Sequence, residues 1–415
     1  MALGFQGCGL FERGNIVKIE RGEEGYQLLV NGEPFYIQGV GVGLASGKKG
    51  ENYLAMAKEL GANAVRTWGT DQGDKAYLDE AHRQGLYVDA GVWLNYVDEL
   101  KTVSYLTDPE YLARKEKETL DYVRRFRKHP AVFMWNIGNE VISFTKSEEE
   151  RVAFCRYLES LALKVHQLDP NHPVIYAASG TLELPYLRKY VPSLDAIGMN
   201  IYGDTLIAHI AWETLKFEAP YLITEFGALG PWDLHKDPNK KTIEQSDVAK
   251  SAHYRNSWNM LRERRNSNLG GFVFHLGETT QDALTFWNIN YRGFKKEAFI
   301  VMQKIFLGKE SVNHAPRIAT FSGVPVSVIP GGSFQVELAA SDAEGENLEY
   351  SYFASTTLEG ILKYYVNSEI PVRVEGQGSK VTVYAPSEPG IYRIYGFVSD
   401  SSGNGSSASA TVQVA

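Results

Sequence analysis

The alternation of two kinds of segment constrains the fold of this chain most strongly. From residue 35 to about residue 306, short apolar runs alternate with longer segments in which apolar residues recur at helical spacing. This alternation is typical of repeated βα units, and eight parallel strands with intervening helices close into a (β/α)8 barrel. The eight candidate strands are FYIQGV (35–40), NAVRTW (63–68), LYVDAGVW (86–93), AVFMWN (131–136), PVIYAA (173–178), DAIGMNIY (195–202), PYLITEF (220–226) and GGFVFHL (270–276).

The segments between these runs carry helix signals. In residues 52–61, Leu54, Ala57 and Leu60 line one helical face and Gly61 ends the pattern. The segment 108–129 has an acidic first turn and a basic last turn, which suit the helix dipole. We therefore predict the α/β class and a TIM barrel over residues 35–312.

The two flanks of the barrel have a different texture. Residues 1–34 contain a strand, a turn and a strand, with Asn31-Gly32 as a hairpin signal, and we predict that this hairpin extension covers the bottom of the barrel. Residues 313–415 contain short alternating strands separated by Gly, Pro, Ser and Asn, with almost no helical period. This spacing predicts a C-terminal immunoglobulin-like β-sandwich.

Composition narrows the class of ligand. The net charge of -8 and the pI of about 5.7 argue against nucleic acid, and no run approaches 18 consecutive apolar residues, so we expect no membrane span. Aromatic residues make up 12% of the chain and offer flat faces on which sugars stack. The acidic, soluble composition favours an extracytoplasmic (periplasmic or secreted) protein whose targeting segment is not present in this sequence.

Residues at the carboxyl ends of the strands are the candidates for a site, because a TIM barrel places its active site there. Glu140 follows the fourth strand and Glu225 ends the seventh, so both carboxyl groups point into the same mouth. Cleavage of a glycosidic bond needs one protonated and one ionised carboxyl group, about 5–5.5 Å apart for retention and further apart for inversion. Taken singly, Glu140 can be an exposed loop residue and Glu225 a buried partner of Arg66; together they favour glycoside chemistry.

The neighbours of the two glutamates offer a way to separate their pKa values. Arg66 and Tyr202 can hold Glu225 ionised, whereas Glu140, beside the neutral Asn139, can stay protonated. The tryptophans near the mouth are either core residues or sugar platforms. The remaining candidates for substrate binding are Trp68, Trp93, Asn95, Asn200, Trp232, His275 and Trp287, and Glu278 also follows the last strand.

Four segments resemble clan A retaining glycoside hydrolases. The segment NGEPF (31–35) is similar to the NGxPF motif that is typical of family 2 and its relatives. The segments GANAVRTWG, HPAVFMWNIGNE and APYLITEFG continue the match in order over most of the first 307 residues. The resemblance implies double displacement with Glu225 as nucleophile and Glu140 as acid/base, with no metal or organic cofactor. It also implies that Asn139 holds the sugar 2-hydroxyl and that Arg66 and Tyr202 orient Glu225.

Two departures and two alternatives accompany this resemblance. The N-terminal sandwich domains of typical family 2 enzymes are absent from this sequence, and His275 stands where many clan members have a tryptophan, with Trp287 as a substitute. The segments VRTWGTD, NIGNEV and LITEFGA also resemble β-glucan transglycosylases, for which Trp93, Tyr96 or Trp232 can bind the acceptor sugar. The minor alternative is a non-catalytic carbohydrate-binding protein. We expect a retaining hydrolase that acts on β-linked glycans, with the sugar, the linkage, internal or terminal cleavage and the oligomeric state undetermined.

Overall fold

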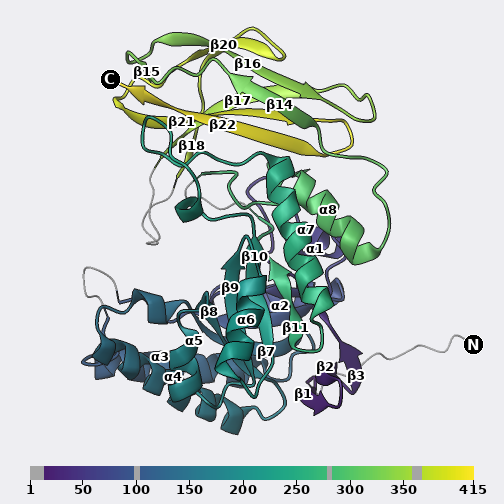
Figure 1. Cartoon of the computed structure of the whole chain (residues 1–415), viewed down its shortest axis with the longest axis vertical. Coiled ribbons are helices and arrows are strands. Elements are labelled where there is room, and N and C mark those ends of the chain that lie inside the picture. The colour runs from purple at the N-terminus through teal and green to yellow at the C-terminus, as the bar shows by residue number, and fades with distance from the viewer. Residues whose placement is uncertain (1–13, 98–102, 278–282, 358–366) are drawn as a thin grey trace, which may run out of the picture.

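The computed structural model describes residues 14–97, 103–277, 283–357 and 367–415 (Figure 1). Its first element is a three-stranded antiparallel sheet of β1 (Val17–Gly22), β2 (Gly25–Val30) and β3 (Glu33–Phe35). Asn31 and Gly32 join β2 to β3 with φ values of 54° and 87°, the left-handed pair that a tight hairpin turn requires. Val17, Leu28 and Val30 pack on Ile37 and Phe133 in one buried cluster, so this sheet covers the amino-terminal end of the barrel.

Eight parallel strands close the barrel, which confirms the central fold prediction. Their order around the barrel is β10-β11-β4-β5-β6-β7-β8-β9, so chain order is kept all the way round and β11 pairs with β4. Each strand is buried on both sides, which explains its continuous apolar sequence. The strands are β4 (Ile37–Gly41), β5 (Ala64–Arg66), β6 (Tyr87–Val92), β7 (Val132–Asn139), β8 (Val174–Ser179), β9 (Ala196–Tyr202), β10 (Tyr221–Gly227) and β11 (Asn268–Val273).

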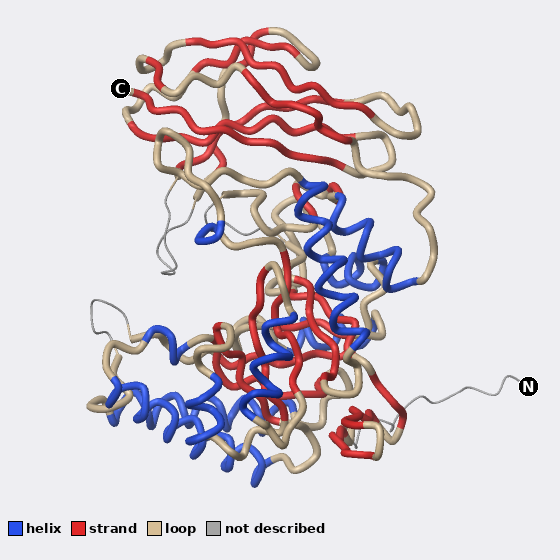
Figure 2. Tube along the Cα trace, viewed as in Figure 1, coloured by secondary structure: helices blue, strands red, loops and turns tan. Residues whose placement is uncertain are grey.

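Helices surround the barrel, coloured blue around the red strands in Figure 2. Several begin with a capping side chain that accepts a hydrogen bond from the first turn; Asp108, for example, accepts from the Tyr111 N–H at 2.9 Å. Among the described residues, no helix is both long and apolar enough to cross a membrane. The helices are α1 (Tyr53–Glu59), α2 (Lys75–Arg83), α3 (Pro109–Phe126), α4 (Glu148–Leu168), α5 (Leu184–Tyr190), α6 (Leu206–Leu215), α7 (Asp247–Glu263) and α8 (Glu297–Leu307), with short 3-10 turns η1 (Val141–Phe144) and η2 (Pro231–Asp233).

The chain after α8 forms two further β-sheets. One has the order β14-β16-β20-β19 and the other β15-β22-β21-β17-β18, with Phe321 and Phe334 of the first sheet packed against Ile394 and Val412 of the second. We call these two sheets the C-terminal unit. Its strands are β14 (Arg317–Ser322), β15 (Ser327–Val328), β16 (Ser333–Ser341), β17 (Glu349–Thr356), β18 (Glu369–Ile370), β19 (Val374–Glu375), β20 (Lys380–Tyr384), β21 (Gly390–Ser399) and β22 (Gly405–Val414).

The C-terminal unit packs directly on the barrel. Figure 1 shows β21 and β22 next to the ends of α7 and α8. Phe353, Tyr395 and Phe397 alternate with the residues that face the other sheet, and they belong to the same buried cluster as the barrel core. Between β11 and α8 the chain also forms a small hairpin of β12 (Asn290–Tyr291) and β13 (Phe294–Lys295), and the Tyr291 ring stacks on Phe353 at 5.8 Å between centroids. The two parts therefore share one continuous core.

Candidate active site

The two glutamates singled out from the sequence lie at the carboxyl end of the barrel. Glu225 sits within β10, in register with Asn200 of β9, and Glu140 is the first residue after β7. Glu140 has a φ of 57°, and its N–H donates to the Ala177 carbonyl at 2.8 Å. A non-glycine residue in this left-handed region is strained by about 1 kcal/mol or more, and such strain clusters at functional sites. Here the turn ends the strand and directs the carboxyl group into the mouth.

Three donors surround the Glu225 carboxylate. Arg66 Nη1 and Trp68 Nε1 donate to Oε1 at 2.6 and 2.7 Å, and the Tyr202 hydroxyl donates to Oε2 at 2.5 Å. Glu225 is only 5% exposed, so these donors replace water. A full positive charge and two hydrogen bonds favour the ionised form of a carboxylate, which is the form that a nucleophile needs.

Glu140 has a different environment. The Asn200 amide donates to its Oε1 at 2.7 Å, and no cation forms an ion pair with it in the described part of the chain. Burial, and then the charge on Glu225, raise the pKa of Glu140 to about 8. At pH 7 this group therefore holds a proton that it can donate. The two carboxyl groups thus have opposite environments, as an acid/base assignment requires.

Two asparagines connect the pair. The Asn139 Oδ1 atom accepts from Arg66 Nη2 at 2.8 Å and from Asn200 Nδ2 at 3.1 Å, and Asn139 Nδ2 donates to the Tyr96 hydroxyl at 3.3 Å. Thr224 donates to Asn200 Oδ1 at 2.7 Å, which fixes the orientation of the Asn200 amide. Arg66, Asn139, Asn200 and Tyr202, all sequence candidates, are therefore one connected network with Glu140 and Glu225.

Two buried acids behind this network were missed from the sequence. Asp89 in β6 is fully buried, 3.8 Å from Arg66 Nε, and burial raises its pKa to about 7. Glu183 lies in the loop after β8, accepts from the Ser143 N–H at 2.8 Å, and burial raises its pKa to about 7 as well. The position of Asp89 inside the apolar run LYVDAGVW marks it in the sequence as a buried charge. Glu183 lies in a loop, where no such pattern marks it.

Aromatic rings flank the carboxyl pair in two groups. Tyr202 lies beside Trp287 and Trp232, with centroid distances of 5.3 and 6.0 Å, and Trp232 is 60% exposed. On the other side Trp93 and Tyr96 are 5.2 Å apart, and Tyr96 stacks on Phe144 at 4.1 Å. Trp93, Trp232 and Trp287 thus lie at the mouth as candidates for sugar platforms, and Phe144 adds a ring that sequence analysis did not single out.

His275 and Asn95 have more peripheral places. The His275 ring packs edge-on near Trp68 at 6.4 Å, its Nε2 has no hydrogen-bond partner among the described residues, and burial lowers its pKa to about 4, so it is neutral at pH 7. Asn95 Oδ1 accepts from the Tyr111 hydroxyl at 3.3 Å, so its amide turns toward α3 and away from the carboxyl pair. Glu278 lies outside the described residues.

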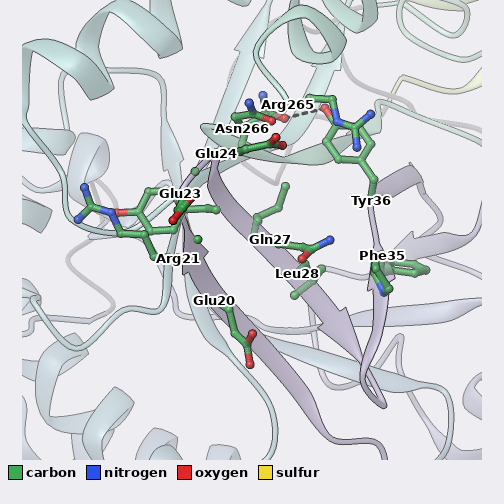
Figure 3. A pocket seen from close by; sticks show the side chains of 16 residues that line it. Glu20, Arg21, Glu23, Glu24, Gln27, Leu28, Phe35, Tyr36, Arg265 and Asn266 are labelled. Atoms are coloured by element: carbon green, nitrogen blue, oxygen red, sulfur yellow. Dashed lines mark hydrogen bonds between the residues drawn. The ribbon is translucent and has the colours of Figure 1, made fainter.

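A separate cavity lies at the opposite end of the barrel. It has a volume of about 490 Å³ and opens between the amino-terminal sheet and the turn before β11, where Glu24, Tyr36, Arg265 and Asn266 line it (Figure 3). The amino-terminal end of a TIM barrel contributes stability, and chemistry takes place at the other end. In the described part of the chain, no group of three or more His, Cys, Asp or Glu side chains is arranged to hold a metal ion.

The fold and the site define a class: a (β/α)8 barrel with a carboxyl pair at the ends of its fourth and seventh strands. The sequence model of the family described as "Glycosyl hydrolases family 2, TIM barrel domain" matches residues 22–251. The chain belongs to this family, a member of the clan A glycoside hydrolases.

Known relatives of the chain are β-glucuronidases. It is 28% identical over 265 residues to the enzyme of Paenibacillus borealis and 26% identical over 253 residues to that of Rattus norvegicus, which covers 57% and 55% of this chain. These alignments span 43% and 36% of the relatives' own length. Among solved structures, a Bacteroides uniformis β-glucuronidase has a TM-score of 0.55 at 14% identity, covering 96% of this chain and 48% of that one, and thus shares the fold.

Proposed function

We propose that the chain is a retaining glycoside hydrolase that acts on β-linked glycans by double displacement. The observation that carries this proposal is the opposite environment of the two carboxyl groups: Glu225 accepts three hydrogen bonds, one of them from a guanidinium, while burial keeps a proton on Glu140. Family membership supports the same assignment.

The proposed mechanism has two steps. Glu225 Oε attacks the anomeric carbon while Glu140 gives its proton to the glycosidic oxygen, so the bond from carbon to the leaving oxygen breaks and a glycosyl ester forms. Glu140, now ionised, takes a proton from water, whose oxygen attacks the same carbon and releases Glu225. Arg66 and Tyr202 hold Glu225 in place, and the Asn139 amide is the group that would bind the sugar 2-hydroxyl.

For the substrate we propose a neutral sugar next to the carboxyl pair. The largest effects of charge on the pKa of Glu140 come from Glu225 and Glu183, which raise it, and then from Arg66, which lowers it. Arg66 already donates to Thr224, Glu225 and Asn139. A sugar carboxylate would need a cation of its own to offset desolvation. The relatives are named β-glucuronidases, so a β-glucuronide is the substrate that tests this point.

The test is product analysis on a panel of aryl β-glucosides, galactosides, mannosides and glucuronides, followed by β-linked glucans. Release of the aryl group with retained β configuration of the sugar, observed by NMR, is the expected result for at least one neutral sugar. Inversion of configuration would contradict the double displacement. Cleavage of the glucuronide alone would contradict the neutral-sugar proposal and leave the mechanism in place.

A second candidate function is β-glucan transglycosylation with the same carboxyl pair. Trp232 favours it, because this 60% exposed ring lies beside Tyr202 and Trp287, where an acceptor sugar can stack and compete with water. Products longer than the starting glucan, detected by mass spectrometry, would identify this activity.

We also propose that the C-terminal unit is an immunoglobulin-like sandwich. The order of its strands supports this: the first, third and seventh strands (β14, β16, β20) are neighbours in one sheet, and in the other sheet β21 lies between β17 and β22. A structure-based alignment with immunoglobulin-like domains tests it, and a different connectivity between the sheets would contradict it.

A further inference from the structure

The segment 283–288, which we call the wall segment, connects the candidate active site with the C-terminal unit. Its last part carries Trp287, whose carbonyl accepts from the Tyr254 hydroxyl at 2.9 Å and from the His275 N–H at 3.3 Å. The Trp287 ring lies 5.3 Å from that of Tyr202, the residue that donates to Glu225. The position of the wall segment therefore decides where one side of the site lies.

The wall segment is buried but contains no helix or strand. Without a backbone ladder, its place depends on hydrogen bonds to other parts of the chain. The Leu284 N–H donates to the Tyr395 hydroxyl of β21 at 3.0 Å. The Thr285 carbonyl accepts from Lys250 Nζ at 2.9 Å and from Lys296 Nζ at 3.1 Å, and the Thr285 hydroxyl donates to Glu244 at 2.8 Å.

The same charged groups bind the C-terminal unit. Lys296 Nζ donates to Ser407 Oγ of β22 at 3.0 Å, and the Ser409 hydroxyl donates to Glu244 Oε2 at 2.8 Å. The side chains of Glu244, Lys250 and Lys296 are 3%, 6% and 1% exposed. Hydrogen bonds between ionised groups away from water are strong and hold their partners in one geometry.

We propose that the C-terminal unit is a positioning part of the active site: Tyr395, and Ser407 through Lys296, hold the wall segment so that Trp287 and Tyr202 stay in place beside Glu225. This inference rests on the proposed function of the carboxyl pair. It gives the C-terminal unit a role in catalysis although none of its described residues takes part in the hydrogen-bond network around Glu140 and Glu225. Tyr395 and Ser407 are positioning residues, since they act through other groups.

The test compares two Tyr→Phe variants of the full chain. Tyr395→Phe removes the acceptor of the Leu284 N–H and keeps the stacking on Phe353. The matched control is Tyr392→Phe on the same strand, where the lost hydrogen bond runs to the Glu388 carbonyl within the C-terminal unit. We expect Tyr395→Phe to lower kcat/KM for the best aryl β-glycoside by about 5- to 10-fold, the size of one lost buried hydrogen bond. Tyr392→Phe should leave kcat/KM unchanged.

Combining Tyr395→Phe with a substitution of Trp287 shows whether the loss of kcat/KM depends on Trp287. In Trp287→Ala, the further change Tyr395→Phe should lower kcat/KM by less than twofold, because the ring that it positions is gone. A full additional 5- to 10-fold loss in this background, or equal effects of Tyr395→Phe and Tyr392→Phe, would overturn the proposal. Ser407→Ala provides an independent variant and should act in the same direction as Tyr395→Phe.

Failure of the proposed function can be told apart from failure of this inference. The emission of Trp287, obtained as the difference between the spectra of the wild type and Trp287→Phe, needs no substrate. One outcome is that the wild type cleaves none of the glycosides while Tyr395→Phe shifts this emission and Tyr392→Phe does not. In that case the enzyme assignment is wrong, and the inference that Tyr395 positions the wall segment is supported. An unshifted emission in Tyr395→Phe refutes the inference, whatever the activity.

Discussion

Glu140 and Glu225 carry the same functional group but have different neighbours in this fold. Arg66, Trp68 and Tyr202 all donate to Glu225, whereas Glu140 accepts from the neutral Asn200. Burial opposes the ionisation of Glu140, and the direct ion pair with Arg66 is made by Glu225. In the proposed mechanism, the side chains at the ends of β5 and β9 therefore distinguish the acid from the nucleophile, and single substitutions can separate the two roles.

Replacing the nucleophile tests the first role. Glu225→Gln keeps the size of the side chain but cannot form a glycosyl ester, so we expect turnover to fall by roughly 10⁴-fold or more. The measurement is the steady-state rate on an aryl β-glycoside, with circular dichroism to verify that the variant is folded. Activity within tenfold of the wild type would remove Glu225 from the mechanism.

Replacing the acid/base tests the second role. Glu140→Ala removes the proton donor but leaves the nucleophile, so substrates with a good leaving group should still form the glycosyl-enzyme. External azide fits the space of the lost carboxyl group and needs no general base. We expect it to restore turnover and to give a β-glycosyl azide, identified by NMR. An azide product of α configuration, or none, contradicts the assignment.

The raised pKa of Glu140 also predicts how stability depends on pH. Between its ordinary value of 4.5 and about 8 the folded state keeps a proton that the unfolded chain has released. The contribution of Glu140 to the free energy of unfolding therefore falls as the pH rises through this window. Glu140→Gln removes the titration, so we expect the variant to be more stable than the wild type at pH 8, on the order of 1–3 kcal/mol, and similar at pH 4.5. Urea unfolding at both pH values measures this difference, and a difference that does not change with pH would contradict it.

At the scale of elements, the parts of the fold that are regular in sequence were predictable. Each barrel strand reads as an apolar run because both of its faces are buried, and the candidates Arg66, Asn139, Asn200 and Tyr202 were found because they end such runs. The wall segment has no period, and its position depends on Tyr395, 111 residues after Leu284. Phe144 ends the short 3-10 turn η1 and Glu183 lies in a loop, so neither belongs to a periodic segment. What the sequence does not reveal is set by contacts between distant segments.

The seam between the first and last barrel strands gives a prediction for the barrel as a structural element. A Cβ atom at Gly39 in β4 would lie 2.2 Å from the ring of Phe272 in β11, which is fully buried. We therefore expect Gly39→Ala to lower the free energy of unfolding by about 1–3 kcal/mol, the cost of overpacking. The control is Gly22→Ala at the end of β1, where the nearest atom lies 3.9 Å away. Urea unfolding of both variants tests the seam, and equal stabilities would contradict it.

At the scale of the whole molecule, the barrel and the C-terminal unit share a hydrophobic core and a buried network of charges. Burial raises the pKa of Glu244, but the charges of Lys250, Lys296 and Arg393 outweigh it and lower that pKa to about 2. A lowered pKa contributes stability above the ordinary value of 4.5, and this contribution is lost as the pH falls toward 2. Glu244 thus couples barrel residues to Arg393 and Ser409 of the C-terminal unit at neutral pH.

This coupling predicts how the molecule unfolds. We expect the wild type to show one calorimetric transition at pH 7, because separation of the barrel from the C-terminal unit would expose the buried Lys250 and Lys296. Glu244→Gln leaves buried lysines short of a counter-charge and should lower stability by about 3–5 kcal/mol, with the transition splitting in two. Glu337→Gln, which loses an exposed ion pair with Lys380, is the control and should cost about 1 kcal/mol or less. Two transitions in the wild type, or equal effects of the two variants, would mean that the parts fold independently and that the charge network only fills their interface.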